Sequence, residues 1–141
     1  MASRRRLTLT APSPFSYAVY RLVPRIDRGE CINVAVVVFS RPARFLGVAT
    51  ALDRDRARAL WPELDLEAVE LHLRSLEQVA AGDPAAGPIA ELDDTARFHW
   101  LVAPASTIVQ PSAVHTGVCD DLPRQLEHLA RELLTPPTTE R

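Results

Sequence analysis

The chain has 141 residues, of which 47% are hydrophobic and 24% charged, and its formal net charge is −2. These values are typical of one globular domain that can bury its own core, and no apolar stretch approaches the roughly 20 residues that a membrane-spanning helix needs. No secretory signal is expected, because the arginines at positions 4–6 are not followed by an apolar run. The two cysteines, Cys31 and Cys119, suit free thiols in a reducing cytoplasm better than a disulfide framework.

The first third of the chain is predicted to form three strands. Residues 1–14 are polar, basic and proline-bearing, and we expect a flexible tail there. In residues 15–23, alternate side chains would point to opposite faces of a strand, and both faces are largely apolar. This pattern indicates a mostly buried strand. Residues 32–39 are apolar at every position but Asn33, which predicts the central strand of a sheet. Residues 45–51 form a third strand, and the short connections imply antiparallel neighbours.

The hydrophobic period then changes from two residues to 3.6. Asp53 can serve as the N-cap of a short helix that ends before Pro62, and Asp65 can begin a longer one. The longer helix has one apolar stripe, made of Leu66, Val69, Leu73, Leu76 and Ala80. Residues 82–88, with their proline, glycine and alanine, predict a loop.

The last third is predicted to hold two more short strands and a final helix. Residues 98–103 and 107–110 are rich in aromatic and β-branched side chains, and a proline follows each run. Residues 112–121 are expected to be irregular. Asp121 can cap the final helix, whose apolar stripe is Leu122, Leu126, Leu129 and Leu133.

This order of elements, βββ-αα-ββ-α, predicts an α+β fold. Strands cluster with strands, so the sheet should be antiparallel, with about five strands and with helices packed on at least one face. We expect a single domain over residues 15–135. Residues 136–141, which begin with two prolines, should form a second flexible tail.

Arginine usage and charge distribution each have two interpretations. All 16 basic residues are arginines, which we attribute to GC-rich codon usage; the alternative is a need for forked hydrogen-bond donors. Residues 1–58 carry 11 arginines and 4 acids, whereas residues 59–141 carry 5 arginines and 14 acids. We expect the two halves to pair with each other, and a basic surface facing an acidic or nucleic-acid partner is the alternative.

Motifs with a specific chemistry are absent from the sequence. It contains no glycine-rich dinucleotide fingerprint, no Walker loop, no HExxH, no paired CxxC and no GxSxG elbow. The lack of lysine excludes Schiff-base and pyridoxal phosphate chemistry. We therefore predict no cofactor.

The polar segment between His99 and Asp120 is the first candidate site. His115 and Cys119 have the spacing HxxxC, and His99 or Asp120 could complete a zinc site. In a second interpretation, Cys119 is a nucleophile, His115 is its general base and Asp120 orients the histidine. We favour a third, a packed histidine and a buried free thiol, and expect no bound metal.

The predicted turn between the first two strands is the second candidate site. Arg21 and Arg28 could clamp a phosphate or carboxylate group, with Glu30 and Asn33 beside them. The alternative, which we favour, is that both arginines pair with the acids of the turn, Asp27 and Glu30, and lock the hairpin. Aromatic residues make up only 6% of the chain, so the exposed stacking platform of a single-strand nucleic-acid binder is not supported.

Several sequence blocks resemble one bacterial family. They are Phe15-Ser-Tyr-Ala-Val, Arg21-Leu-Val-Pro, Arg28-Gly-Glu, Asn33-Val-Ala-Val-Val-Val-Phe, Arg97-Phe-His-Trp-Leu-Val-Ala-Pro, and the run from Gln110-Pro-Ser to His115-Thr-Gly. The resemblance, to the domain-of-unknown-function family numbered 3037, covers roughly residues 15–134. The family has no established activity. Its genes are described as neighbours of HipA-like kinase genes, which implies a kinase as partner.

The resemblance also implies which residues bind. The matching polar positions are Arg21, Arg28, Glu30, Asn33, His99, Gln110, His115, Thr116 and Asp120. We expect the turn near Arg28 and the segment near His115 to lie at the same end of the sheet and to form one recognition site. The first hypothesis is a cytoplasmic protein-binding or regulatory module, accessory to a HipA-like kinase. The alternative is a small hydrolase or nucleic-acid-processing enzyme that uses the histidines, arginines and acids.

Overall fold

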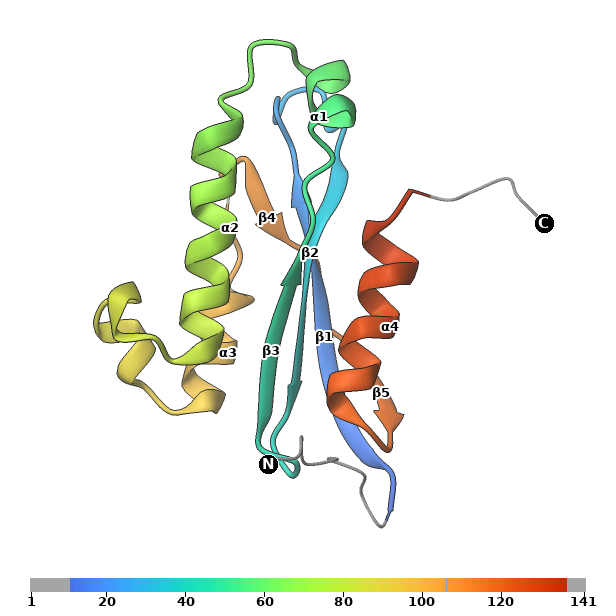
Figure 1. Cartoon of the computed structure of the whole chain (residues 1–141), viewed down its shortest axis with the longest axis vertical. Helices are drawn as coiled ribbons and strands as arrows, with labels where there is room; N and C mark the ends of the chain where they lie inside the picture. Colours follow the sequence, from blue (N-terminus) through green and yellow to red (C-terminus); the bar gives the residue numbers. More distant parts are fainter. Residues whose placement is uncertain (1–10, 106, 137–141) are drawn as a thin grey trace, which may run out of the picture.

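The computed structural model describes residues 11–105 and 107–136 (Figure 1). Its elements are β1 (Ser13–Leu22), β2 (Ile32–Ser40), β3 (Phe45–Thr50), α1 (Arg54–Leu60), α2 (Leu66–Ala81), the 3₁₀ turns η1 (Pro84–Ala86) and η2 (Pro88–Glu91), α3 (Asp94–Leu101), β4 (Val109–Pro111), β5 (His115–Cys119) and α4 (Leu122–Leu134). The predicted α+β fold with a five-stranded antiparallel sheet is confirmed.

The sheet is built around β1 and β2. Its strand order is β3-β2-β1-β4, and β5 also pairs with β1. β1 is long enough to hold β5 along its first half and β4 along its last residues. Residues 34–38 of β2 are completely buried, which confirms the prediction of a central strand.

Helices cover both faces of the sheet (Figure 1). α2 and α3 lie on one face, and α4 lies on the other. The apolar stripe predicted for α2 is buried, and Asp65 caps this helix by accepting a hydrogen bond from the Ala68 amide. Asp53 and Asp121 cap α1 and α4 in the same way. No helix within the described residues has the length and apolarity needed to cross a membrane.

The segment at residues 98–103 differs from its prediction as a strand. Its first four residues complete α3, which Asp93 caps by accepting a hydrogen bond from the Ala96 amide at 2.8 Å. Phe98 and Leu101, one helical turn apart, are buried, and the ring of Phe98 stacks on Phe39 with centroids 4.7 Å apart. The cap and this packing outweigh the strand preference of the aromatic residues.

The neighbouring strand predictions also need correction. The strand expected at residues 107–110 is β4, which begins at Val109, and the stretch expected to be irregular contains β5. Residues 13 and 14, expected in the N-terminal tail, belong to β1. The other tail residues lie mostly outside the described residues.

Tyr20 links the sheet to α3 and should make stability depend on pH. Its hydroxyl donates a hydrogen bond to the Leu101 carbonyl at 2.7 Å, and burial raises its pKa above the ordinary value of about 10. Below pH 10 the phenol is neutral in both the folded and unfolded states. Above pH 10 the unfolded state ionises first, so the free energy of unfolding should fall by up to about 1.4 kcal/mol per pH unit.

Tyr20→Phe tests this prediction. The variant should lose about 1–2 kcal/mol of stability at pH 7, because the Leu101 carbonyl loses its donor, and it should show a shallower decline above pH 10. Thermal melting of both proteins from pH 7 to pH 11 measures the difference. Parallel curves over the whole range would contradict the assignment to Tyr20.

Candidate functional site

Three of the predicted binding residues form a row across the sheet. Arg21 on β1 lies opposite Asn33 on β2 and Gln110 on β4. The row faces α4, since Tyr20 and Leu22 on either side of Arg21 are buried against the α2 side. The Asn33 amide donates to the Leu133 carbonyl of α4 at 3.1 Å, so Asn33 anchors the end of that helix.

Of this row, Arg21 has the freest side chain. Gln110 donates to the Thr107 carbonyl at 2.7 Å and so stabilises its own loop. Arg21 is exposed, and within the described residues it forms no ion pair. The row therefore offers one available guanidinium rather than a built pocket.

His115 and Thr116 lie on β5, further along β1. His115 is opposite Tyr17, and their rings are 5.2 Å apart between centroids. Thr116 is opposite Ser16 and points to the other face of the sheet. Tyr17 and Arg21 are four residues apart on one strand, about 13 Å, which is too far for His115 and Arg21 to hold one small group between them.

The turn between β1 and β2 is closed by its own ion pairs. Arg28 donates to Glu30 at 2.8 Å and lowers the pKa of that carboxyl group, and Arg25 pairs with Asp27. The expected locking of the hairpin is confirmed for Arg28, whereas Arg21 takes no part in it. Arg25 also lies over the ring of Trp61, 5.2 Å from its centroid.

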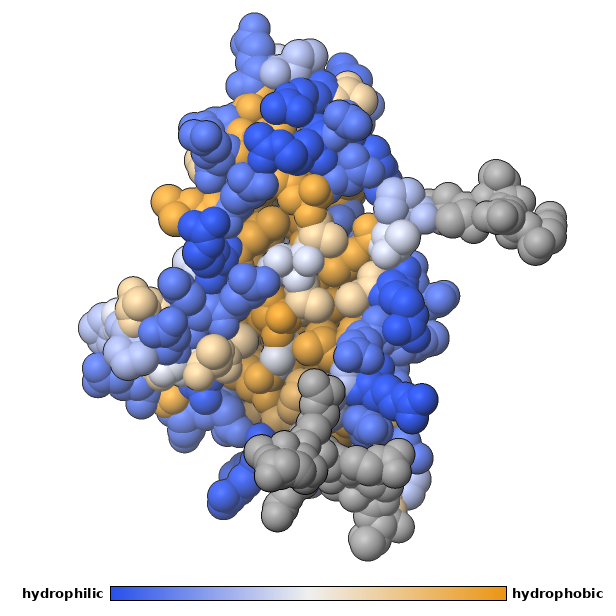
Figure 2. All heavy atoms as spheres, in the orientation of Figure 1, coloured by the Kyte–Doolittle hydropathy of each residue, from blue (hydrophilic) through white to orange (hydrophobic). Residues whose placement is uncertain are grey.

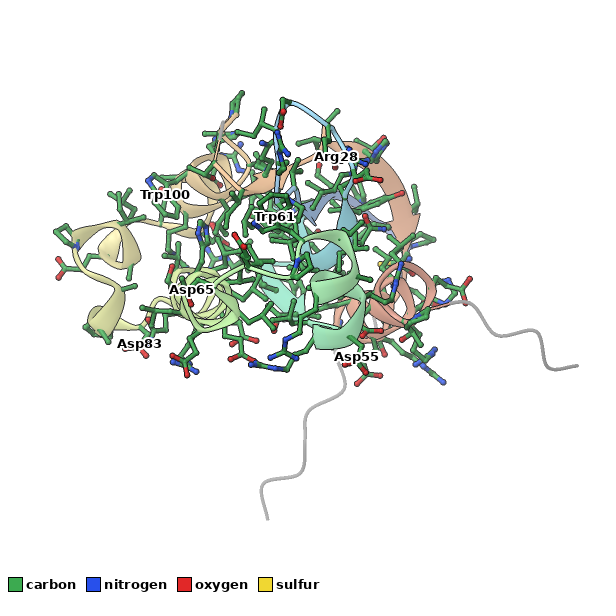
Figure 3. All side chains as sticks on the ribbon, turned by 90° about the horizontal axis from the view of Figure 1, so that it is seen from above. Arg28, Asp55, Trp61, Asp65, Asp83 and Trp100 are labelled. Carbon is green, nitrogen blue, oxygen red and sulfur yellow. The ribbon has the colours of Figure 1, made fainter. Side chains whose placement is uncertain are left out.

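The expectation that all these residues meet at one end of the sheet is wrong. β1 ends at the turn that holds Arg28, whereas β5 pairs with the first half of β1, so Asp120 follows at the opposite end. His99 is exposed on α3, on the other face from Arg21. Trp100, its neighbour in the chain, is well separated from Arg28 in the view from above (Figure 3).

The HxxxC pattern does not form a site. On a strand, residues four apart are about 13 Å from each other, so His115 and Cys119 cannot share a metal ion. Burial raises the pKa of the Cys119 thiol, which opposes a role as a nucleophile. In the described part of the chain, no three histidine, cysteine or acidic side chains are placed to hold a metal together.

A hollow of about 790 Å³ lies between the β2–β3 turn and the start of α3, but its charged residues serve the fold. Asp93 caps α3, and Arg97 donates to the carbonyls of Val79, Ala80 and Leu92. The remaining charges, Arg41, Arg44 and Asp94, are of both signs. The hollow therefore has no preference for one kind of charged ligand.

A second hollow, of about 410 Å³, lies along the free side of β3. We call it the β3 trough. It is lined by Phe45, Leu46, Gly47 and Val48 of β3, by Glu77, Ala80 and Ala81 of α2, and by Pro123, Leu126 and Glu127 of α4. Figure 2 shows apolar surface filling the space between the two helices, with hydrophilic residues on both sides.

The β3 trough exists because β3 is an edge strand with no protection. Its sequence, Phe-Leu-Gly-Val-Ala-Thr, has no charge and no proline, the residues that normally keep an edge from pairing. A Cβ atom at Gly47 would lie 2.9 Å from Leu126, so the glycine lets α4 pack close to the edge. The sequence does not predict this site, because an apolar composition indicates a buried strand and the strand order cannot be inferred from composition.

Comparison with known proteins gives a family but no activity. A family model described as a protein of unknown function (DUF3037) matches residues 17–134. No curated protein and no solved structure matches the chain. The matched range includes β3, α2 and α4, so the β3 trough falls entirely within it.

Proposed function

The chain belongs to the DUF3037 family, whose description names no activity, and we propose that it is a protein-binding module that uses the β3 trough. One observation carries this proposal, the apolar hollow along an uncharged edge strand. An unpaired sheet edge offers backbone donors and acceptors as well as apolar surface. Contiguous apolar surface with a polar rim is typical of a site that another protein covers.

The enzyme hypothesis has no comparable support. Acid–base catalysis needs its groups within hydrogen-bond reach of one reacting atom. His99, His115 and Arg28 instead lie on three separate elements. A regulatory role with a HipA-like kinase as partner stays a prediction from the family resemblance, and a cytoplasmic location stays a prediction from the cysteine usage.

Site-specific photo-crosslinking in the native host tests the proposal. A benzophenone amino acid at Ala81, which is exposed in the β3 trough, should give a covalent adduct with another protein. The matched control is Leu71, which is 63% exposed on the outer face of α2, and it should give none. Mass spectrometry of the adduct identifies the partner and shows whether it is a kinase.

The outcome is decided by the difference between the two positions. No adduct at Ala81, or equal adducts at Ala81 and Leu71, would contradict binding through the β3 trough.

A further inference from the structure

We propose that the occupant of the β3 trough is an extended segment of a partner protein that adds to β3 as a further strand and carries two consecutive basic residues. This inference rests on the proposed function and specifies how the partner binds in the β3 trough. Three observations support it: the direction of the free peptide groups of β3, the covering of both faces by helices, and two carboxylates on the rims.

The free peptide groups of β3 can be assigned from one hydrogen bond. Just beyond β3, the Ala51 amide donates to the Val34 carbonyl at 2.9 Å, in line with the β2–β3 register. In an antiparallel pair the residues bonded to the partner alternate with residues whose peptide groups point away. The peptide groups of Leu46, Val48 and Thr50 therefore point away from β2, where no strand of the described chain pairs with them, and Leu46 and Val48 line the β3 trough.

An added strand would be covered on both faces. Its side chains would point alternately towards α2, where Ala80 and Ala81 line the β3 trough, and towards α4, where Pro123 and Leu126 line it. The small residues on the α2 side leave room for a side chain of the occupant. A helical occupant could not pair with the free peptide groups, whereas an extended segment satisfies them.

The rims supply the charge preference. Glu77 on α2 and Glu127 on α4 lie on opposite faces of the sheet, and within the described residues neither pairs with an arginine. Among the residues that the structure describes, the Glu77 side chain accepts one hydrogen bond, from the Thr50 hydroxyl at 2.8 Å. Consecutive residues of a strand point to opposite faces, so two consecutive basic residues would reach one carboxylate each.

The same carboxylates argue against a second copy of this chain as the occupant. A twofold pairing of β3 with β3 would bring the troughs of two copies together. The lining of each β3 trough contains two glutamates, Glu77 and Glu127, and no basic residue. Four carboxylates would then share one interface without a positive charge, which disfavours the symmetric dimer.

The first test uses synthetic peptides and the full chain. The probe is fluorescently labelled Thr-Val-Arg-Arg-Val-Thr, and the control has Glu-Glu in place of Arg-Arg. Fluorescence anisotropy should show at least tenfold weaker binding of the control. N-methylation of the peptide amides on one edge should abolish binding, whereas N-methylation on the other edge should not, since only one edge faces β3.

Charge reversal in the protein should invert this preference. Glu77→Arg combined with Glu127→Arg should bind the Glu-Glu peptide more tightly than the Arg-Arg peptide. Glu67→Arg combined with Glu132→Arg changes the net charge equally on the same two helices but outside the β3 trough, and it should keep the original preference. An equal response of the two double variants would overturn the assignment of the rims.

Amide hydrogen exchange tests strand addition directly. In the free protein the amides of Leu46, Val48 and Thr50 should exchange fast, while those of Gly47 and Ala49 are already protected by β2. Saturating Arg-Arg peptide should protect the first three. Peptide binding without this protection would overturn strand addition, while crosslinks from Ala81 would leave the proposed function standing.

Two other occupants give distinct outcomes, and either would overturn the proposal. Protection of the three amides that grows with protein concentration alone, together with a dimer in sedimentation, would assign the edge to a second copy. Protection in the free chain that disappears when residues 1–10 are removed would assign it to the chain's own N-terminal segment. If both the crosslinks and the protection are absent, the proposed function fails together with this inference.

Discussion

Val36→Asp is expected to unfold the protein. Val36 is completely buried in the middle of β2, opposite Val19 on β1 and Ala49 on β3. An aspartate there would have either to bury an unpaired charge or to take up a proton, and both cost several kcal/mol. The whole stability of a protein of this size is about 5–15 kcal/mol, so the loss should leave little folded protein. Circular dichroism and thermal melting measure it.

Val118→Asp is the matched control for this substitution. Val118 is also a strand valine, on β5, but it is 67% exposed. The same change of side chain should therefore shift stability by no more than about 0.5 kcal/mol. A native spectrum and an unchanged melting midpoint for Val36→Asp would show that β2 is not the centre of the core.

What could be predicted from the sequence follows from local patterns. The run at residues 32–39 is too short for a helix and too apolar for an edge strand with one solvent-exposed face. Its central position in the sheet could therefore be inferred. The stripe of α2 and the caps at Asp53, Asp65 and Asp121 are also local, because the spacing and the capping side chain lie within one or two helical turns.

What could not be predicted depends on contacts between distant parts of the chain. Residues 98–103 are rich enough in aromatic and β-branched side chains for a strand, and their helical state is fixed by the packing of Phe98 on Phe39. The pairing of β5 with the first half of β1 separates His115 from the turn at Arg28, although the sequence suggested that they would meet. The same strand order leaves β3 at an edge and so creates the β3 trough.

The polar residues of the family resemblance illustrate this further. Asn33 and Gln110 bind backbone carbonyls, and Arg28 pairs with Glu30 inside the turn. A polar residue in a recurring pattern can thus stabilise the chain locally instead of binding a ligand. Arg97, which stands in the same pattern, donates hydrogen bonds to three backbone carbonyls, more than any other of these residues.

Arg97→Ala should therefore destabilise the protein by about 2–4 kcal/mol, because three charged hydrogen bonds to backbone carbonyls, two of them partly buried, are lost. The guanidinium donates to Val79 at 3.0 Å and to Ala80 at 2.6 Å, at the end of α2 where carbonyls lack helical partners. It also donates to Leu92 at 3.0 Å, so one side chain joins the end of α2 to the segment that leads into α3. Urea unfolding measures the loss as a lower midpoint.

Two further variants separate the effect of the forked guanidinium donors of Arg97 from the effect of its positive charge. Arg97→Lys keeps the positive charge near the C-terminal end of α2 but presents one ammonium group, which cannot reach three carbonyls in different directions, so it should recover only part of the lost stability. Arg131→Ala removes an exposed arginine from the last turn of α4 and should cost less than about 0.5 kcal/mol. The same urea midpoint for Arg97→Ala and Arg131→Ala would show that the hydrogen bonds of Arg97 do not stabilise the α2–α3 connection.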